Sequence, residues 1–355
     1  MFSRNLLRLT FATCLAFAPF SPAASAAPSD TRAAFLKLVD RPRVSLAASA
    51  SEPLNISEGK FTQIAFSFAA DAQQRVPGIL VKSASVSRNA PVRRPVVIAL
   101  HGTSGTKESQ LPLLTELAEL GFIAVAIDGR YHGARTKAGK GSVEYSDAIL
   151  RAYRERPNGE HPFFFDTAWD VMRLIDYLET RDDVDASRIG LIGFSKGGIE
   201  TYLAAAADPR IGVAVPCIGV QSFGWAIDHD SWQSRISTIQ SAFDIAAQES
   251  EVAKPGADFV RKFYDGVAPG IYHQFDGPAM LPLIAPRPLL SINGETDDRT
   301  PLPGLEQCAA PTRAAYEAAG AEDRFVLHIQ PQTGHKVTPE AMQLARQWFV
   351  RWLKP

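Results

Sequence analysis

The sequence predicts an α/β fold, with a mostly parallel, eight-stranded-type sheet flanked by helices and a helical insertion as a cap. Two observations predict it. First, short apolar runs alternate with segments of helical periodicity, which is typical of parallel strands covered by helices. These runs are RPVVIAL, GFIAVAID, RIGLIGF, IGVAVPCIGV, RPLLSIN and RFVLHIQ. Second, 46% of the 355 residues are hydrophobic and 21% are charged, as in globular proteins with a large core.

Helical spacing predicts covering helices over residues 109–120, 166–179, 198–206 and 339–353. Before them, residues 61–84 contain two alternating apolar runs joined by a polar turn, which predicts two paired strands. Pro77 and Gly78 in the second run favour an edge position, because proline cannot donate to a strand ladder. Residues 27–60 are weakly periodic, and we expect one short helix over 31–39 in this N-terminal segment.

Two connections are longer than usual for a compact fold, at residues 132–162 and 221–283. The second is too aromatic for a solvated linker, so we interpret about 221–283 as a cap. Four of its aromatic side chains either line a substrate pocket or form the cap's own small core: Trp225, Trp232, Tyr264 and Tyr272.

The first 26 residues have the pattern of a signal peptide. Arg4 and Arg8 precede an apolar run, and Ala24-Ser25-Ala26 follows as a cleavage pattern. A membrane anchor is the alternative, but the run over 9–20 is shorter than the roughly 20 residues that span a bilayer. We therefore expect an exported protein, periplasmic or secreted, with Cys217 and Cys308 either paired or buried as thiols.

The formal net charge is −1, and like charges do not form blocks. This excludes the basic footprint of nucleic-acid binding and a polybasic membrane patch. We expect a small-molecule substrate. The chemistry described next requires no metal and no organic cofactor.

The strongest motif is Gly193-Phe194-Ser195-Lys196-Gly197, between the apolar run RIGLI and an alanine-rich helical segment. Strand, sharp turn and helix are the context of a nucleophile elbow, in which glycines leave room for the tight turn. The alternative is a glycine-rich turn that holds a phosphate, but G-x-G-x-x-G is absent there. We expect Ser195 to be the nucleophile and the Lys196 side chain to be exposed to solvent.

His101-Gly102-Thr103 ends another apolar run, where this arrangement places half of an oxyanion hole. We assign the two donors to the backbone N–H groups of Thr103 and Lys196. The His101 ring is interpreted as support for this turn.

A serine nucleophile needs a base, and His335 supplies one on the loop between the last apolar run and the last helix. The acid is expected after RPLLSIN, in a loop that holds three carboxylates, Glu295, Asp297 and Asp298. We choose Asp297 from its spacing to Gly294 and Pro301, with Asp298 as the main rival. The chain order serine, acid, histidine is that of α/β hydrolases.

With HGTSG, DGRYHG, GFSKGG, GETDDRTP and GH in this order, residues 61–355 resemble the dienelactone-hydrolase and acetyl-xylan-esterase branch of the α/β hydrolases. That branch overlaps in pattern with prolyl-oligopeptidase-type catalytic domains. Dienelactone hydrolases have a cysteine nucleophile, so Ser195 points away from lactone cleavage. In the D-x-R-x-x-G segment that starts at Asp128, we expect Asp128 and Arg130 to form a structural ion pair.

The resemblance implies a serine carboxylesterase that works through an acyl-enzyme. A serine peptidase is the nearest alternative, because the same residues cleave amides. A catalytically silent binding protein on the same fold is the second alternative.

Overall fold

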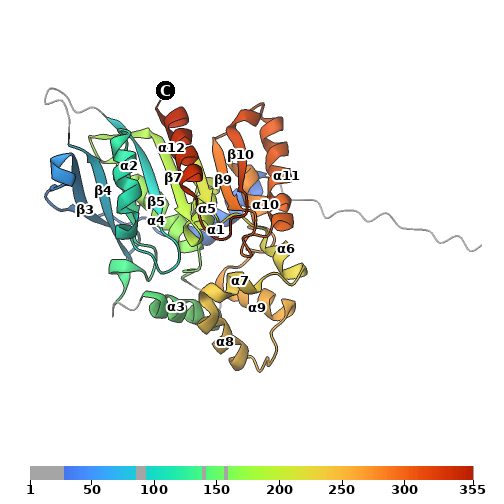
Figure 1. Cartoon of the computed structure of the whole chain (residues 1–355). Coiled ribbons are helices and arrows are strands. Elements are labelled where there is room, and N and C mark those ends of the chain that lie inside the picture. Colours follow the sequence, from blue (N-terminus) through green and yellow to red (C-terminus); the bar gives the residue numbers. More distant parts are fainter. Residues whose placement is uncertain (1–27, 85–92, 138–140, 156–158, 355) are drawn as a thin grey trace, which may run out of the picture.

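In the computed structural model, which describes residues 28–84, 93–137, 141–155 and 159–354, one twisted sheet runs through the molecule (Figure 1). The first 26 residues, which the sequence marks as a signal peptide, lie outside these ranges. The strands are β1 Ser49–Ala50, β2 Leu54–Ile56, β3 Phe61–Ala69, β4 Arg75–Ser83, β5 Arg94–Leu100, β6 Ile123–Ile127, β7 Val184–Phe194, β8 Ile211–Cys217, β9 Leu289–Gly294 and β10 Phe325–Gln330.

Eight of the strands, β3 to β10, lie in the order β3-β4-β6-β5-β7-β8-β9-β10. From β6 to β10 neighbouring strands are parallel, whereas β4 is antiparallel to both β3 and β6. The expected mostly parallel sheet is confirmed. It has ten strands rather than eight, because the N-terminal segment adds β1 and β2 beside β3.

The expected edge position of the second hairpin strand is wrong, since β4 lies between β3 and β6. The Pro77 carbonyl accepts the N–H of Asp128, just beyond the last ladder pair, Gly78 with Ile127. In an antiparallel pair the N–H and C=O of one residue face the same neighbour. The missing N–H of Pro77 therefore faces the end of β6, beyond the last ladder pair, where the Asp128 carbonyl accepts a hydrogen bond from Arg135 instead.

Helices cover both faces of the sheet. Helix α2 Leu111–Glu119 and helix α12 Pro339–Leu353 pack on one face. The other face is covered by α1 Pro28–Val39, α4 Phe165–Glu179, α5 Lys196–Ala207, α10 Gly277–Met280 and α11 Leu302–Ala318. The 3-10 turns are η1 Ser57–Gly59, η2 Lys107–Gln110, η3 Gly133–Arg135, η4 Ser237–Ile239, η5 Leu281–Ile284 and η6 Glu322–Arg324.

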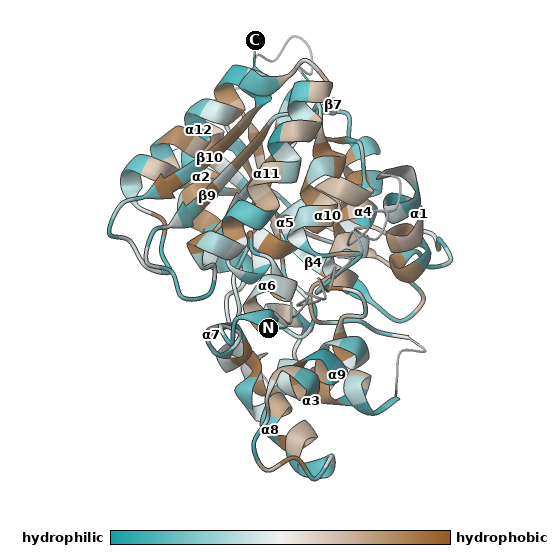
Figure 2. Cartoon of the chain, turned by 90° about the vertical axis from the view of Figure 1, so that its right-hand side faces the viewer, coloured by the Kyte–Doolittle hydropathy of each residue, from teal (hydrophilic) through white to brown (hydrophobic). Residues whose placement is uncertain are grey.

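A separate group of helices forms the cap, below the sheet in Figures 1 and 2. It contains α3 Gly141–Glu155 from the first long connection, and α6 Phe223–Asp228, α7 Gln233–Ile236, α8 Gln240–Glu249 and α9 Ala257–Val267 from the second. Helix α3 packs against α8 and α9. The two insertions therefore build one cap, which the sequence had shown only as two unrelated connections.

Candidate active site

Ser195 occupies the sharp turn between β7 and α5, and its φ of 55° is unusual for a residue that carries a side chain. The turn leaves no room for side chains at its two glycines. A Cβ on Gly193 would lie 2.1 Å from the carbonyl oxygen of Gly197, and one on Gly197 would lie 2.5 Å from that of Leu100. Close backbone approach therefore explains the G-x-S-x-G spacing.

Three distant segments bring Ser195, His335 and Asp297 into one hydrogen-bonded line. The Nε2 atom of His335 lies 2.7 Å from the Ser195 Oγ, and its Nδ1 lies 2.7 Å from Asp297 Oδ2. The Asp297 side chain is fully buried, while the His335 side chain is 19% exposed. The line thus runs from a buried carboxylate to a hydroxyl at the rim of the sheet, as acyl transfer requires.

Of the three competing carboxylates, Asp297 contacts His335. Burial raises the pKa of Asp297, but the hydrogen bond and charge of His335 outweigh burial, so this pKa lies below its usual range. The other two carboxylates are exposed, and Glu295 accepts the N–H of Gln332. Asp297 is therefore the carboxylate placed to hold the imidazole.

The loop after β5 lies against the nucleophile. A Cβ on Gly102 would lie 3.6 Å from the Ser195 Cβ, so the backbone just before Thr103 passes close to the nucleophile turn. Lys196 is the first residue of α5, where backbone N–H groups have no acceptor within the helix. The loop that carries the Thr103 N–H and the helix start that carries the Lys196 N–H therefore both border Ser195.

The expected exposure of the Lys196 side chain is wrong, because only 2% of it is exposed. It turns away from solvent to pair with Glu200, which is equally buried, and its Nζ lies 5.7 Å from the ring centre of Tyr145 in the cap. The helix explains this direction, since side chains four residues apart lie on one face. Burial raises the pKa of Glu200 despite the lysine beside it.

His101 supports the same loop, as expected. Its Nδ1 lies 2.7 Å from the Gly102 carbonyl, and its Nε2 accepts the N–H of Gly129 at 2.9 Å. Since a carbonyl only accepts, Nδ1 carries the proton and the ring is neutral. Burial and the charge of Lys196 lower the pKa of His101 to about 4. The ring thus joins the loop after β5 to the loop after β6.

The expected ion pair between Asp128 and Arg130 is wrong. Asp128 pairs with Lys107, with Nζ to Oδ2 at 2.8 Å. Arg130 turns the other way, toward Asp170 on α4, with Nη2 to Oδ1 at 3.1 Å. Two residues apart in a loop, these side chains point to different neighbours, and the sequence does not show which.

The four aromatic residues proposed for a substrate pocket belong largely to the packing of the cap. Tyr264 is 1% exposed and lies edge-on to Phe223. Trp232 packs beside Phe243, and Trp225 stacks on His229. Tyr272 is half-buried and donates to Asp265. Of the two roles left open by the sequence, these contacts favour the core of the cap.

Arg235, on α7 of the cap, is a candidate that the sequence did not reveal. It is 3% exposed, and its Nη2 donates to the carbonyl of Arg299 at 3.1 Å and to Gln221 Oε1 at 3.3 Å. Among the described residues, no carboxylate forms an ion pair with it, and burial lowers its pKa to about 10. No motif surrounds Arg235, so only the fold places it beside the Asp297 loop.

Cys217 and Cys308 are both free and buried, so the pairing left open by the sequence does not occur. Within the described ranges, no three His, Cys, Asp or Glu side chains are grouped as metal ligands would be. In the same ranges, every helix is too short or too polar to cross a bilayer.

Comparison with known proteins gives the family. The family described as "Glucuronyl esterase, fungi" matches residues 82–320, which are 239 of the 355 residues. The chain belongs to the glucuronyl esterase family. This match confirms the resemblance to esterases of the α/β-hydrolase class. The protein is a serine-type carboxylic ester hydrolase.

Individual relatives agree with this family. The protein YtaP of Bacillus subtilis (strain 168) is 28% identical over 238 residues, 67% of each chain. The 4-O-methyl-glucuronoyl methylesterase 1 of Wolfiporia cocos is 30% identical over 159 residues, 44% of this chain and 37% of that protein. The chain therefore aligns with well under half of that methylesterase.

Solved structures agree in fold. An acetyl xylan esterase from Paenibacillus sp. R4 has a TM-score of 0.62 at 19% identity, covering 92% of this chain and 93% of that one. A glucuronoyl esterase from Solibacter usitatus has a TM-score of 0.61 at 16% identity, covering 91% of each chain. The predicted α/β-hydrolase fold is thus confirmed.

Proposed function

We propose that Ser195, His335 and Asp297 carry the ester hydrolysis. The two 2.7 Å contacts through His335 are the observation that supports this assignment. Ser195 attacks the ester carbonyl while His335 Nε2 takes its proton, and Asp297 stabilises the imidazolium. His335 then gives the proton to the leaving alcohol. In the second half, water attacks the acyl-enzyme and passes a proton to His335, which returns it to Ser195 Oγ as the bond to the acid breaks.

The backbone N–H groups of Thr103 and Lys196 are proposed to hold the oxyanion formed in each attack. One preorganised donor contributes about 3 kcal/mol to a transition state of this kind. The burial of the Lys196 side chain supports the assignment, because its pairing with Glu200 fixes the first turn of α5. The donor therefore does not need to be organised during the reaction.

For the substrate we propose an ester whose acid part is a uronic acid of a carbohydrate. The family supports this choice, and so does Arg235. A buried guanidinium without a carboxylate is costly, and an acyl group rich in oxygen acceptors would supply partners. A simple alkyl acyl group has no such oxygen atoms. Arg235 would then recognise the acid side of the ester.

Hydrolysis of benzyl glucuronate, p-nitrophenyl acetate, acetylated xylan and a peptide amide by the purified protein tests this choice. We expect the highest kcat/KM on benzyl glucuronate and no cleavage of the amide. Arg235→Met should raise KM for benzyl glucuronate about tenfold, which corresponds to one lost charged hydrogen bond, and should affect p-nitrophenyl acetate less. Equal activity on all three esters, unchanged by Arg235→Met, would reject the uronic-acid assignment but not the esterase.

We also propose that residues 1–26 are removed on export to the periplasm or medium, and that residues 61–355 are the catalytic domain, which includes the cap. The pattern of Arg4, Arg8 and Ala24-Ser25-Ala26 supports export. N-terminal sequencing of the protein from its native cell should start at Ala27. A start at Met1 would contradict the proposal.

A further inference from the structure

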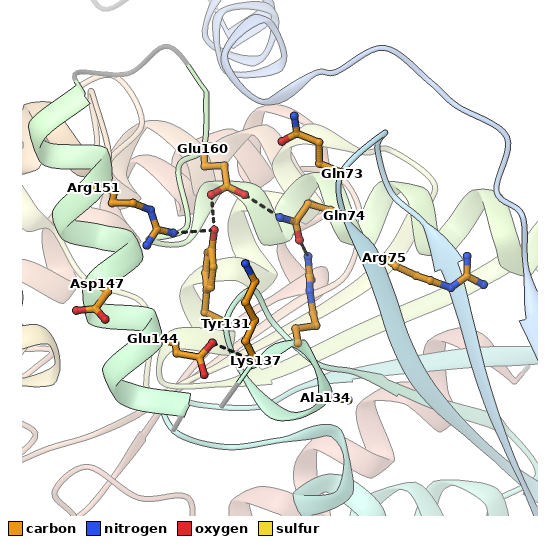
Figure 3. A pocket seen from close by; sticks show the side chains of 11 residues that line it. Gln73, Gln74, Arg75, Tyr131, Ala134, Lys137, Glu144, Asp147, Arg151 and Glu160 are labelled. Carbon is orange, nitrogen blue, oxygen red and sulfur yellow. Dashed lines mark hydrogen bonds between the residues drawn. The ribbon is translucent and has the colours of Figure 1, made fainter. Parts of the chain in front are cut away.

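A hollow lies away from Ser195, between the β3–β4 turn and helix α3 of the cap (Figure 3). Its volume is about 780 Å³, within the usual range of small-molecule sites. Four separate chain segments form its walls: residues 73–75, residues 131–137, helix α3 and Glu160.

The floor of this hollow is a fixed network of polar side chains. The Tyr131 hydroxyl donates to Glu160, and Gln74 Nε2 donates to the same carboxylate at 2.9 Å. Arg135 donates to Gln74 Oε1 at 2.8 Å, and Arg151 donates to the Tyr131 hydroxyl at 3.2 Å. Figure 3 shows Glu160 and Arg151 meeting at this hydroxyl, with Gln74 on the other oxygen of Glu160. Such preorganised groups can bind a ligand without first losing rotamer freedom.

Charged side chains beneath the hollow already compensate the charges of its floor. Arg135 pairs with the buried Asp170 at 2.6 Å, and Arg130 lies 3.3 Å from Glu160. The rim carries two cations, Lys137 and Arg151, and two carboxylates, Glu144 and Asp147, so its formal charges balance as well. Arg75 points away (Figure 3) and donates to Ser67 Oγ on the neighbouring strand. A strongly anionic or cationic ligand would gain little here.

Tyr131 has a φ of 59°, an uncommon conformation for a bulky residue. Such strain persists only where the surroundings hold it, and it clusters at ligand sites. In this conformation the half-buried phenol ring of Tyr131 points into the hollow, and the Arg151 guanidinium lies 5.5 Å from the ring centre. The ring adds an apolar face to an otherwise polar wall.

The lining of the hollow includes none of Ser195, His335 and Asp297. Ser195 follows β7 and Tyr131 follows β6, with β5 between these strands. Buried His132 lies between the two places, its ring 5.0 Å from that of His101 and 4.7 Å from that of Tyr145. A ligand in the hollow is thus separated from the reacting atoms by packed side chains.

We propose that this hollow binds a neutral oligosaccharide at a site distinct from the catalytic one. Sugar hydroxyls both donate and accept, so they match neighbouring carboxylate, amide and guanidinium groups in a way that a simple anion does not. The apolar face of a sugar ring suits the Tyr131 ring. The proposal does not depend on which ester Ser195 cleaves.

Calorimetric titration of the full chain carrying Ser195→Ala, which cannot turn over an ester, tests the site. The probes are xylohexaose, cellohexaose and mannohexaose. We expect saturable binding of at least one of them. Asp147→Ala on the rim and Glu160→Gln on the floor should each weaken it about fivefold or more, as expected for one or two hydrogen bonds.

The matched control is Asp258→Ala, which removes an exposed aspartate from cap helix α9 and should leave the Kd unchanged. Thermal unfolding confirms that each variant is folded. Absence of binding by all three hexaoses overturns the proposal. So does binding that both hollow variants leave intact, or tighter binding of an oligogalacturonate than of every neutral hexaose. Because Ser195 is absent throughout, these outcomes are independent of the ester assays.

Discussion

Two clusters of polar side chains lie on the same edge of the sheet and differ in exposure and in pairing. The triad cluster, Ser195, His335 and Asp297, ends at a hydroxyl beside a histidine side chain that is 19% exposed. The arginine cluster, around Arg130 and Asp170, is at most 1% exposed at these two side chains. One cluster is a hydrogen-bonded line that ends at a hydroxyl, and in the other cluster opposite charges neutralise one another.

The difference shows that position on this edge is not enough to make a residue catalytic. Arg130 follows β6 as Ser195 follows β7, yet its guanidinium is surrounded by carboxylates of α4 and the β3–β4 turn. Such a cluster ties the loop after β6 to α4 and to the β3–β4 turn, and the Arg130 guanidinium is already paired with carboxylates of the protein. The predictions below separate loss of chemistry from loss of stability.

Ser195→Ala should have the largest effect. We expect kcat to fall by at least about 10⁴-fold, because the remaining binding groups retain only a small part of the catalysis. Covalent labelling by a fluorophosphonate should disappear. Ser187→Ala, at the other end of β7, is the matched control and should label normally. Labelling that survives in Ser195→Ala would show that another residue is the nucleophile.

Asp297→Asn should lower kcat by about 10⁴-fold, because an amide favours the wrong tautomer of the histidine. Asp298→Asn removes the neighbouring exposed carboxylate and should change kcat by only a few-fold. The test is kcat measured at a fixed pH near 8. A larger loss in Asp298→Asn would exchange the two assignments.

Arg130→Met should act on stability instead. Removing one partner of a buried ion cluster leaves carboxylates unpaired, which costs about 3–5 kcal/mol in the free energy of unfolding. Arg313→Met breaks the exposed pair with Glu306 and should cost less than about 1 kcal/mol. Denaturant unfolding measures both. Similar small losses would mean that the arginine cluster contributes no more than a surface pair.

The last predicted effect is a loss of stability in mild acid. Burial and Lys196 lower the pKa of His101 to about 4 and that of His132 to about 2, from 6.5. Below pH 6.5 the unfolded chain binds protons that the folded chain does not, so this stability is present above pH 6.5 and declines as pH falls toward 4.

As pH falls, the free energy of unfolding should decrease with a slope that approaches about 1.4 kcal/mol per pH unit for each histidine. His132→Phe, which keeps a ring against Tyr145, should reduce the slope by about one histidine's share. Urea titrations between pH 7 and pH 4.5 measure this. An unchanged slope would show that His132 is protonated in the folded state.

Local patterns were sufficient for much of the fold and for the order of the site residues. The last helix begins and ends at Pro339 and Leu353 as predicted, because its apolar spacing and the flanking Pro339 are local signals. The nucleophile turn could be predicted equally well, since only glycine fits at positions 193 and 197 on either side of it. Among three carboxylates the spacing also selected Asp297, the one that contacts His335.

Long-range packing decided the rest. The directions of Asp128 and Arg130, and the isolation of Arg235, depend on groups that lie far away in the chain. Lys196 pairs locally with Glu200, but its Nζ also lies 5.7 Å from the ring of Tyr145 in the distant cap helix α3. Pro77 lies inside the sheet because β4 pairs with β6, which comes much later in the chain, as well as with its hairpin partner β3. A sequence specifies local periodicity and backbone sterics directly, but burial of a charge depends on which distant partner the tertiary fold provides.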